Sequence, residues 1–291
     1  MRVRIHDDTS EFWALAKPLY AADPVRHTVA LTVIGNWIAL PDPNEPAPLL
    51  VSIWEGDTLT GVAFRTTRRP LSAGAIPEDA AESVAAALAE VDPGIVGVNG
   101  PRAVVERFAR AWAARQGCAF RETLLSHLYR LDTLSAPTTK GRARLATEDD
   151  VPLLAAWYRA FTIEAMGGQR DAGREESVVR RWFALGSGTM IWEHEGVSVS
   201  SARASTVADG MSRVSAVYTP PEHRCHGYGS AVTAAASQWA LDAGASHVVL
   251  FTDSSNPISN SIYQRMGYRL VCDITEFAFE PAAKSITNFA T

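Results

Sequence analysis

A weak internal repeat restricts the possible folds of this sequence more than any other feature. The segment RIHDDTSEFWALAKPLY, which begins at Arg4, resembles RLATEDDVPLLAAWYRAF, which begins at Arg144, in its arrangement of polar and apolar residues. SIWEGD, which contains Trp54, likewise resembles MIWEHEG, which contains Trp192. The offsets are 140 and 138 residues, so two separate matches agree on one period. Such agreement is typical of a duplicated domain.

A polar segment rich in small residues, TLSAPTTKGRA at residues 133–143, divides the chain almost in half. Segments of this composition are common between domains. We therefore expect a first domain at residues 1–134, a linker at 135–143 and a second domain at 144–281.

The composition is that of a globular protein, because 47% of the 291 residues are hydrophobic and 20% are charged. The net charge of −5 argues against a surface for nucleic acids. Cys118, Cys225 and Cys272 are odd in number and widely spaced, which argues against a disulfide framework. The first residues lack the apolar core of a signal peptide, and the chain has no run of about 18 apolar residues that could span a membrane. We expect a cytoplasmic protein that binds neither nucleic acid nor membrane.

The second half predicts the element order α-α-β-β-β-α-β-α-β. Its first helix follows a capping box formed by Thr147 and Asp150, and its last helix has Asn256 as N-cap and Pro257 at the first position. The expected helices lie at about 151–161, 174–185, 227–244 and 256–267, and the expected strands at 189–195, 197–206, 212–219, 247–252 and 268–280.

The stretch PPEHRCHGYGSAVT at residues 220–233 connects a strand to a helix. The first N–H groups of a helix have no partner within it, and the helix dipole favours negative charge there. Gly227 and Gly229 allow the backbone to approach a ligand closely, and Arg224 adds a positive charge. The stretch therefore suits a phosphate. It is not a dinucleotide fingerprint, because Val232 replaces the third glycine, and the chain has no P-loop motif.

Other roles for this stretch have to be weighed. His223, Cys225 and His226 lack a convincing fourth metal ligand, and neighbouring side chains at 225 and 226 point apart. Cys225 with His226 could be a nucleophile and its base, and the loop could also be a structural turn. Two close glycines beside an arginine exceed what a turn needs. We interpret four tryptophans as core residues from their spacing: Trp157, Trp182, Trp192 and Trp239.

The pair of motifs VYTPPEHRCHGYGS and DSSNPISNSIYQRMGY, in this order and at this separation, resembles the GNAT superfamily of acyl-CoA-dependent N-acyltransferases. The resemblance covers about Arg144–Glu280. It implies an α/β (α+β) fold of two GNAT-like domains, each a mixed, mostly antiparallel twisted sheet flanked by helices, with a splayed parallel strand pair in the second domain. Cys225 departs from the family, which usually has a glycine or a small or basic residue there.

The resemblance also implies how the second half binds acetyl-CoA. The pantetheine arm would pair with the backbone of the splayed strand at Val217, Tyr218 and Thr219, with the Val217 N–H polarising the thioester carbonyl. Asn256 would contact the same arm. The pyrophosphate would lie on the N–H groups of Arg224, Cys225, His226, Gly227, Tyr228, Gly229 and Ser230.

For catalysis, the resemblance places Tyr263 as the acid that protonates the departing thiolate. The attacking amine must lose a proton, because an alkylamine is mostly protonated at pH 7. Glu164, in FTIEAMGG, is our candidate for the base, and Glu193 and Glu222 are weaker candidates. No metal is expected.

The first half lacks this apparatus. Its equivalent loop is AGAIPEDAAES at residues 73–83, in which Glu78 and Asp79 would repel a pyrophosphate. The segment NGPRAVVERFARAW, which parallels NPISNSIYQRMG, contains no tyrosine. We interpret this half as a GNAT-like fold that serves packing and walls the acceptor cleft.

The resulting prediction is an N-acetyltransferase, a monomer or homodimer, that moves an acetyl group from acetyl-CoA to a primary amine of a small molecule in a ternary complex. The alternatives are a non-catalytic acyl-CoA-binding or sensing module and an acetyltransferase for a protein or peptide amine.

Overall fold

The structure is a computed structural model that describes residues 1–43, 45–166 and 173–280. The expected domain end at residue 281 and the two glycines of FTIEAMGG lie outside the described residues.

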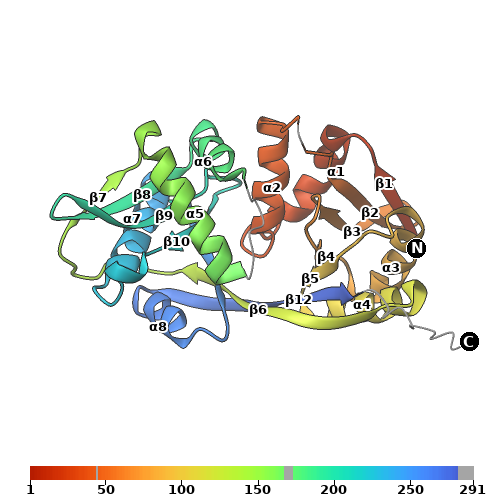
Figure 1. Ribbon diagram of the computed structural model, residues 1–291. Coiled ribbons are helices and arrows are strands. Elements are labelled where there is room, and N and C mark those ends of the chain that lie inside the picture. Colours follow the sequence, from red (N-terminus) through yellow and green to blue (C-terminus); the bar gives the residue numbers. More distant parts are fainter. Residues whose placement is uncertain (44, 167–172, 281–291) are drawn as a thin grey trace, which may run out of the picture. The chain divides into compact units, whose positions relative to one another are not determined.

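The two halves of the chain repeat one succession of elements, which confirms the tandem architecture (Figure 1). The first half comprises β1 (Arg2–His6), α1 (Thr9–Ala21), α2 (Thr28–Ala39), β2 (Leu49–Glu55), β3 (Thr58–Arg65), β4 (Leu71–Ala75), η1 (Glu78–Ala80), α3 (Ala81–Val91), β5 (Gly97–Gly100), α4 (Arg102–Gln116) and β6 (Ala119–Leu131). The second comprises β7 (Arg142–Leu145), η2 (Glu148–Asp150), α5 (Val151–Met166), α6 (Glu175–Ala184), β8 (Gly188–His194), β9 (Val197–Ala204), β10 (Met211–Tyr218), η3 (Pro221–His223), α7 (Tyr228–Asp242), β11 (His247–Asp253), α8 (Pro257–Arg265) and β12 (Tyr268–Glu280). The predicted order of the second half is confirmed, with β7 as an added strand.

The described residues form two compact units that are not contiguous in the chain. One unit contains Met1–Ala22, Asp42–Ser126 and the residues from Asp273, and the other contains Asp23–Pro41 and His127–Cys272. Our prediction that the first domain ends at residue 134 and the second begins at residue 144 assumed that each domain is one contiguous segment. In the first unit, the end of β12 pairs antiparallel with β5, and in the second, α2 joins elements of the other half. Helix α2 lies against β10, with the Thr28 hydroxyl donating to the Met211 sulfur at 2.9 Å.

In the first unit the strands follow the order β1-β2-β3-β4-β5-β12, with β4 and β5 parallel and the other neighbouring pairs antiparallel. Its core gathers around α3 and α4, where Leu88, Phe108 and Trp112 are buried.

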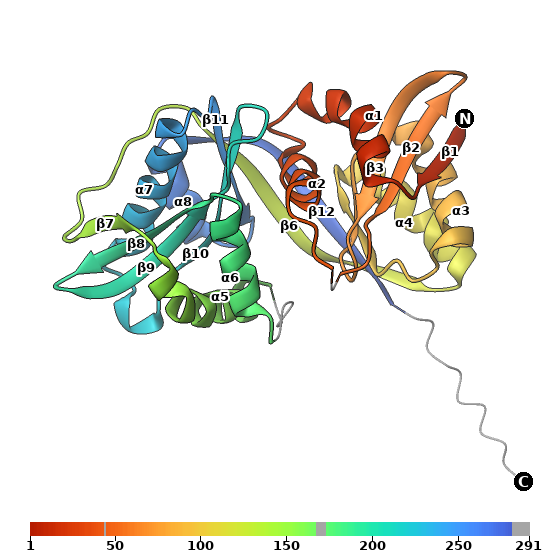
Figure 2. The same ribbon diagram turned by 90° about the horizontal axis from the view of Figure 1, so that it is seen from above.

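In the second unit the order is β12-β6-β11-β10-β9-β8-β7, with β10 and β11 parallel. Helix α7 covers one face of this sheet, and α5 and α6 cover the other (Figure 2). On the α7 face, Val232 and Ala236 pack with Ala204 and Val214. On the opposite face, Leu154 and Trp182 pack with Ile191, and this face carries the pocket described below.

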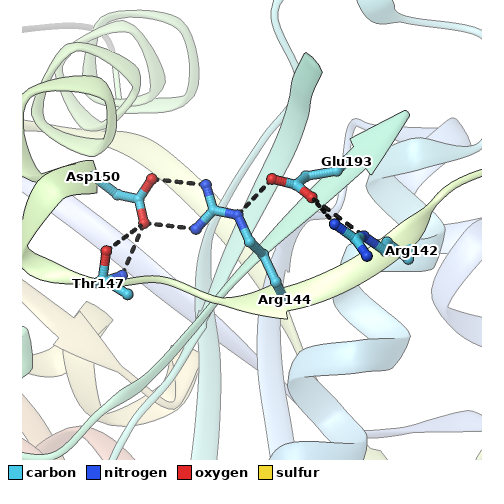
Figure 3. A network of polar contacts seen from close by, with 5 residues as sticks. All are labelled: Arg142, Arg144, Thr147, Asp150 and Glu193. Carbon is cyan, nitrogen blue, oxygen red and sulfur yellow. Dashed lines mark hydrogen bonds and ion pairs between the residues drawn. The ribbon is translucent and has the colours of Figure 1, made fainter. Parts of the chain in front are cut away.

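The join between β7 and α5 is held by a polar network around Arg144 (Figure 3). The Arg144 guanidinium donates to both carboxylate oxygens of Asp150, at 2.6 and 2.8 Å, and to Glu193 at 2.6 Å. The Thr147 N–H donates to Asp150 at 2.8 Å, so the predicted capping box is present. Because Arg144 is beside them, the pKa of both carboxyl groups is lowered from its ordinary value.

No helix in the described part of the chain is long and apolar enough to cross a membrane.

Candidate active site

Strand β10 separates from β11 before it ends. The two strands are in parallel register from Met211 to Val214, whereas β10 continues to Tyr218 and stays paired with β9 there. A bulge interrupts the pairing with β9 between Ser215 and Tyr218, and Ala216 at its centre has a positive φ of 50°. The splayed parallel pair expected in the second half is therefore present, with Val217 and Tyr218 on the strand beyond the split.

The Ser200 hydroxyl fixes the end of β10. It donates to the Tyr218 carbonyl at 2.9 Å and lies 2.8 Å from the Thr219 hydroxyl. Pro220 and Pro221 follow, and prolines have no N–H with which to continue a ladder.

The turn before α7 leaves a group of backbone N–H groups without acceptors. Gly227 is the N-cap, in the left-handed conformation with φ of 81°, and no side chain caps the helix. Within the described residues, no hydrogen-bond acceptor is found for the N–H groups of residues 225–230. The Arg224 N–H differs, because it donates to the Pro221 carbonyl at 3.3 Å. This end of α7 is an array of hydrogen-bond donors at the positive end of a helix dipole, which is the arrangement that binds phosphate.

The two glycines of the turn sit where a side chain would be crowded. A Cβ at Gly227 would lie 3.2 Å from the Thr139 hydroxyl, and one at Gly229 would lie 3.2 Å from the Thr219 hydroxyl. Cys225 also adopts the left-handed region, with φ of 65°. That conformation is costly for a residue with a Cβ, which explains why a glycine would suit this position better.

The side chain of Arg224 is turned away from the donor array. Its Nε donates to the Thr219 carbonyl at 3.0 Å, and its Nη2 donates to Glu164 at 2.6 Å. The Tyr218 hydroxyl donates to the other oxygen of Glu164 at 3.3 Å. Burial and the nearby Glu164 charge raise the pKa of Tyr218. The structure thus brings Glu164 to the end of β10, as expected for a residue of the acceptor side, but its carboxylate already accepts two hydrogen bonds.

The other carboxylates considered as bases lie elsewhere. Glu193 is bound by Arg142 and Arg144 in the network of β7, and Glu222 is exposed in η3.

His226 and Cys225 in the turn have separate contacts. The Nδ1 atom of His226 lies 2.6 Å from the Arg224 carbonyl, and the His226 ring stacks on Tyr228 at a centroid distance of 5.4 Å. Cys225 is exposed. Among the described residues, no group of three or more His, Cys, Asp or Glu is arranged to hold a metal ion.

Helix α8 carries the remaining predicted residues. The Asn256 side chain accepts the Ser259 N–H at 3.0 Å, which confirms Asn256 as the N-cap. Tyr263 is partly buried against the α7 core, with its ring edge to Tyr268 at 6.1 Å. Burial raises the pKa of Tyr263 to about 12, so its hydroxyl keeps its proton at neutral pH.

A small pocket in the α5 and α6 face was not expected from the sequence. Its lining includes Tyr158, Trp182, Thr189, Ser201, Arg203 and Ala216. Ala216 immediately precedes Val217, so the pocket adjoins the bulge where β10 splits from β11. The only sequence signal was an arginine at an inward-facing position of an otherwise small and apolar strand. Of the four tryptophans expected in the core, Trp182 is buried and lines this pocket, and the others are partly buried.

The first half differs at the equivalent place in its glycines and its charges. Strands β4 and β5 pair at Leu71 and Ser72, and a Cβ at Gly100 would lie only 3.2 Å from the backbone of Ala73, just beyond that pairing. The loop before α3 has no glycine between Ile76 and Ala85, and Glu78 binds Arg107 at 3.1 Å.

Comparison with known proteins adds a family to this geometry. Residues 154–268 match the model described as "Acetyltransferase (GNAT) family". No curated protein matches the chain.

Several solved structures share the fold over almost the whole chain. An acetyltransferase from the GNAT family of Colwellia psychrerythraea has a TM-score of 0.60 at 12% identity, covering 96% of this chain and all of that one. A GCN5-related N-acetyltransferase from Sphaerobacter thermophilus has a TM-score of 0.61 at 16% identity, with 94% of each chain covered. A tandem GNAT protein from the clavulanic acid biosynthesis pathway has a TM-score of 0.58 at 12% identity, covering 98% of this chain and all of that one. At such identities the likeness shows the fold, including its tandem form.

Proposed function

We propose that the second half of this chain, whose residues 154–268 match the GNAT acetyltransferase family within a fold shared with a tandem GNAT protein, transfers an acetyl group from acetyl-CoA to an amine. The observation that carries the proposal is the combination of a split strand pair and an uncapped helix N-terminus within one loop of each other.

The array of backbone N–H groups at the start of α7 fits the pyrophosphate of acetyl-CoA. The unsatisfied N–H groups of residues 225–230 offer hydrogen bonds, and glycine at 227 and 229 keeps side chains away from them. Beyond Val214, the β10 edge facing β11 has no register partner, so it suits an extended arm that adds as a strand. We propose Val217, Tyr218 and Thr219 for that pairing, with Asn256 on the far side of the split.

The donor would supply an activated acetyl group as a thioester. The amine nitrogen forms a bond to the carbonyl carbon, the carbon–sulfur bond breaks, and the sulfur leaves as a thiolate that needs a proton. We propose that the Tyr263 hydroxyl gives this proton. Its pKa, raised to about 12, keeps the hydroxyl protonated at pH 7. Because this value lies above the ordinary thiol pKa of about 8.5, the tyrosinate that remains must take a proton back from solvent to complete the step.

The proton lost by the amine goes to a base that we propose to be Glu164. Its carboxylate lies at the end of the split strand, bound to Tyr218 and Arg224. Both hydrogen bonds hold the carboxylate in one position, from which it can orient an ammonium group. If Glu164 acts as base, Glu164→Gln lowers kcat far more than Arg224→Gln does. Equal losses in the two variants would mean that the pair only positions the acceptor.

The second candidate function is an acyl-CoA-binding module without catalysis. A tyrosine at position 263 of α8, partly buried against the core that contains α7, favours the enzyme, because a sensor needs no acid. We propose a small-molecule amine as the acceptor, and the peptides in the test below decide whether a protein amine replaces it.

The test measures CoA thiol release from acetyl-CoA with a panel of small amines and with peptides. The proposal predicts release that depends on the amine and is lost in Gly227→Val. Tight acetyl-CoA binding with no release for any amine would support the sensor instead.

A further inference from the structure

Two partly buried arginines lie on the α5 and α6 face of the second unit without an acidic partner among the described residues. Arg203 in β9 lies opposite Ser215 of β10, and Arg213 is two residues before Ser215 on the same strand, so both side chains leave the same face of the sheet. The Nε and Nη2 atoms of Arg203 donate to a single neutral group, the Ser187 hydroxyl, at 3.1 and 2.9 Å. Its guanidinium also lies 5.2 Å from the centre of the Trp182 ring.

The guanidinium of Arg213 has fewer hydrogen-bond partners than that of Arg203. Its Nη1 atom is buried and has no hydrogen-bond partner in the described part of the chain. No carboxylate of that part forms an ion pair with either arginine or influences its proton affinity. The fold therefore places two positive charges near each other in a region sheltered from water.

This arrangement is unfavourable unless something compensates it. Burial, and for Arg203 also the nearby Arg213 charge, lowers the pKa of Arg203 to about 9 and that of Arg213 to about 10. Proteins normally pair buried charges, since an unpaired charge loses its hydration without gaining a partner. Elsewhere in the same unit Arg144 is paired with two carboxylates.

The unpaired charge lies in the pocket beside the split strand. Arg203 lines it together with Ala216, which precedes Val217, and with Tyr158 of α5. Thr189 lines it too, and the Thr189 hydroxyl is buried and has no partner within the described residues. A guanidinium and a free hydroxyl thus converge on a space next to the proposed position of the reacting carbonyl.

We propose that Arg203, assisted by Thr189 and by the charge of Arg213, binds a carboxylate of the substrate, carried either by the amine acceptor or by the acyl group. This inference rests on the proposed function and specifies its substrate class. A guanidinium matches a carboxylate in shape as well as charge, and the sheltered site strengthens the contact. The anion would supply the counter-charge that the chain itself omits.

The competing explanation is structural: Arg203 could simply hold Ser187 and Trp182 in place. The two explanations differ in substrate preference, which can be measured on the unaltered protein. The first experiment compares CoA release with an amino acid and with its carboxamide, which differ only in the carboxylate. We expect kcat/KM to be roughly 10- to 100-fold higher for the carboxylate form.

The second experiment tests whether the carboxylate belongs to the acyl group of the CoA thioester instead. It compares acetyl-CoA with succinyl-CoA, using an amine that has no carboxylate. A preference of similar size for succinyl-CoA would assign the anion to the acyl group. Equal rates within both pairs would overturn the proposal.

Variants connect the preference to the residue. Arg203→Gln should abolish the preference by slowing the carboxylate substrate alone, and Arg203→Lys should retain part of it. Arg180→Gln is the matched control, because Arg180 is an exposed arginine of the same unit that pairs with Glu148. A uniform loss with both substrates in Arg203→Gln would mean a structural role and would contradict the proposal.

A binding measurement keeps the inference separate from the proposed function. Glutarate, compared with chloride at equal ionic strength, should raise the melting temperature of the parent protein and of Arg180→Gln but not of Arg203→Gln. This result would support the carboxylate site even if no amine were acetylated. The absence of protection in the parent, together with equal substrate rates, would exclude it.

Discussion

At the scale of single residues, the hydroxyl of Tyr263 is the group on which the proposed chemistry depends most. Tyr263→Phe keeps the ring that packs beside Tyr268 and removes only the proton donor. We expect kcat to fall roughly 10- to 1,000-fold, with little change in acetyl-CoA affinity or melting temperature. Steady-state kinetics with a working acceptor provide the measurement. A variant that turns over at the parent rate would show that the thiolate obtains its proton elsewhere.

Cys225 offers a stability test of the phosphate turn. Its φ of 65° costs an L-residue roughly 1–2 kcal/mol, whereas glycine adopts it freely. At an ordinary site glycine is less stable than alanine, because it loses more freedom on folding. Here we expect the order to reverse, with Cys225→Gly more stable than Cys225→Ala by about 0.5–1 kcal/mol in urea unfolding. The usual order, alanine above glycine, would contradict the strained conformation.

The roles of some residues can be predicted from the sequence, and those of others cannot. Asn256 is predictable as an N-cap, because it and its partner Ser259 are three residues apart. The Arg224–Glu164 contact joins residues 60 positions apart and depends on how two elements pack. The isolated charge of Arg203 was equally hidden, since a missing counter-ion can be recognised only when the neighbours are known.

At the scale of elements, local signals were sufficient for most of the second half. Helices α7 and α8 begin and end within a few residues of the expected bounds, because glycine, proline and asparagine mark their ends. Strand β7 was missed, since four residues at a sheet edge give too short a pattern. The bulge at Ala216 was also missed, because it depends on the register with β9.

The network that joins β7 to α5 leads to a prediction about pH. Folding lowers the pKa of Asp150 and Glu193 through Arg144, so their contribution is present above the ordinary carboxyl pKa values of 3.8 and 4.5 and is lost as the pH falls through the lowered values. We expect Arg144→Met to reduce the free energy of unfolding by about 1–2 kcal/mol at pH 7. The deficit should shrink below about pH 4 as the carboxyl groups of the parent become protonated.

Urea unfolding at pH 7 and pH 3 measures this difference. Arg180→Met is the control, because exposed ion pairs contribute little, and it should change stability by less than about 0.5 kcal/mol. A deficit in Arg144→Met that is as large at pH 3 as at pH 7 would rule out the carboxylates as its source.

At the scale of the whole molecule, the internal repeat was the informative sequence feature. It predicted two domains with one element order, and that order is observed. The grouping of α2 with the second unit, and of the end of β12 with the first, was not predictable, because segment exchange leaves no periodic signal. Helix α2, from the first half of the chain, packs against β10 within the second unit.

The asymmetry between the halves is the central claim, and calorimetric titration of the full chain with acetyl-CoA tests it most directly. Among the described residues, the N–H groups at the start of α7 have no acceptor in the second half, whereas the first half has Glu78 in its loop and no glycine there. We predict one molecule bound per chain, with binding weakened in Gly227→Val and unchanged in Glu78→Gln. Two equivalent sites, or no binding at all, would contradict the account.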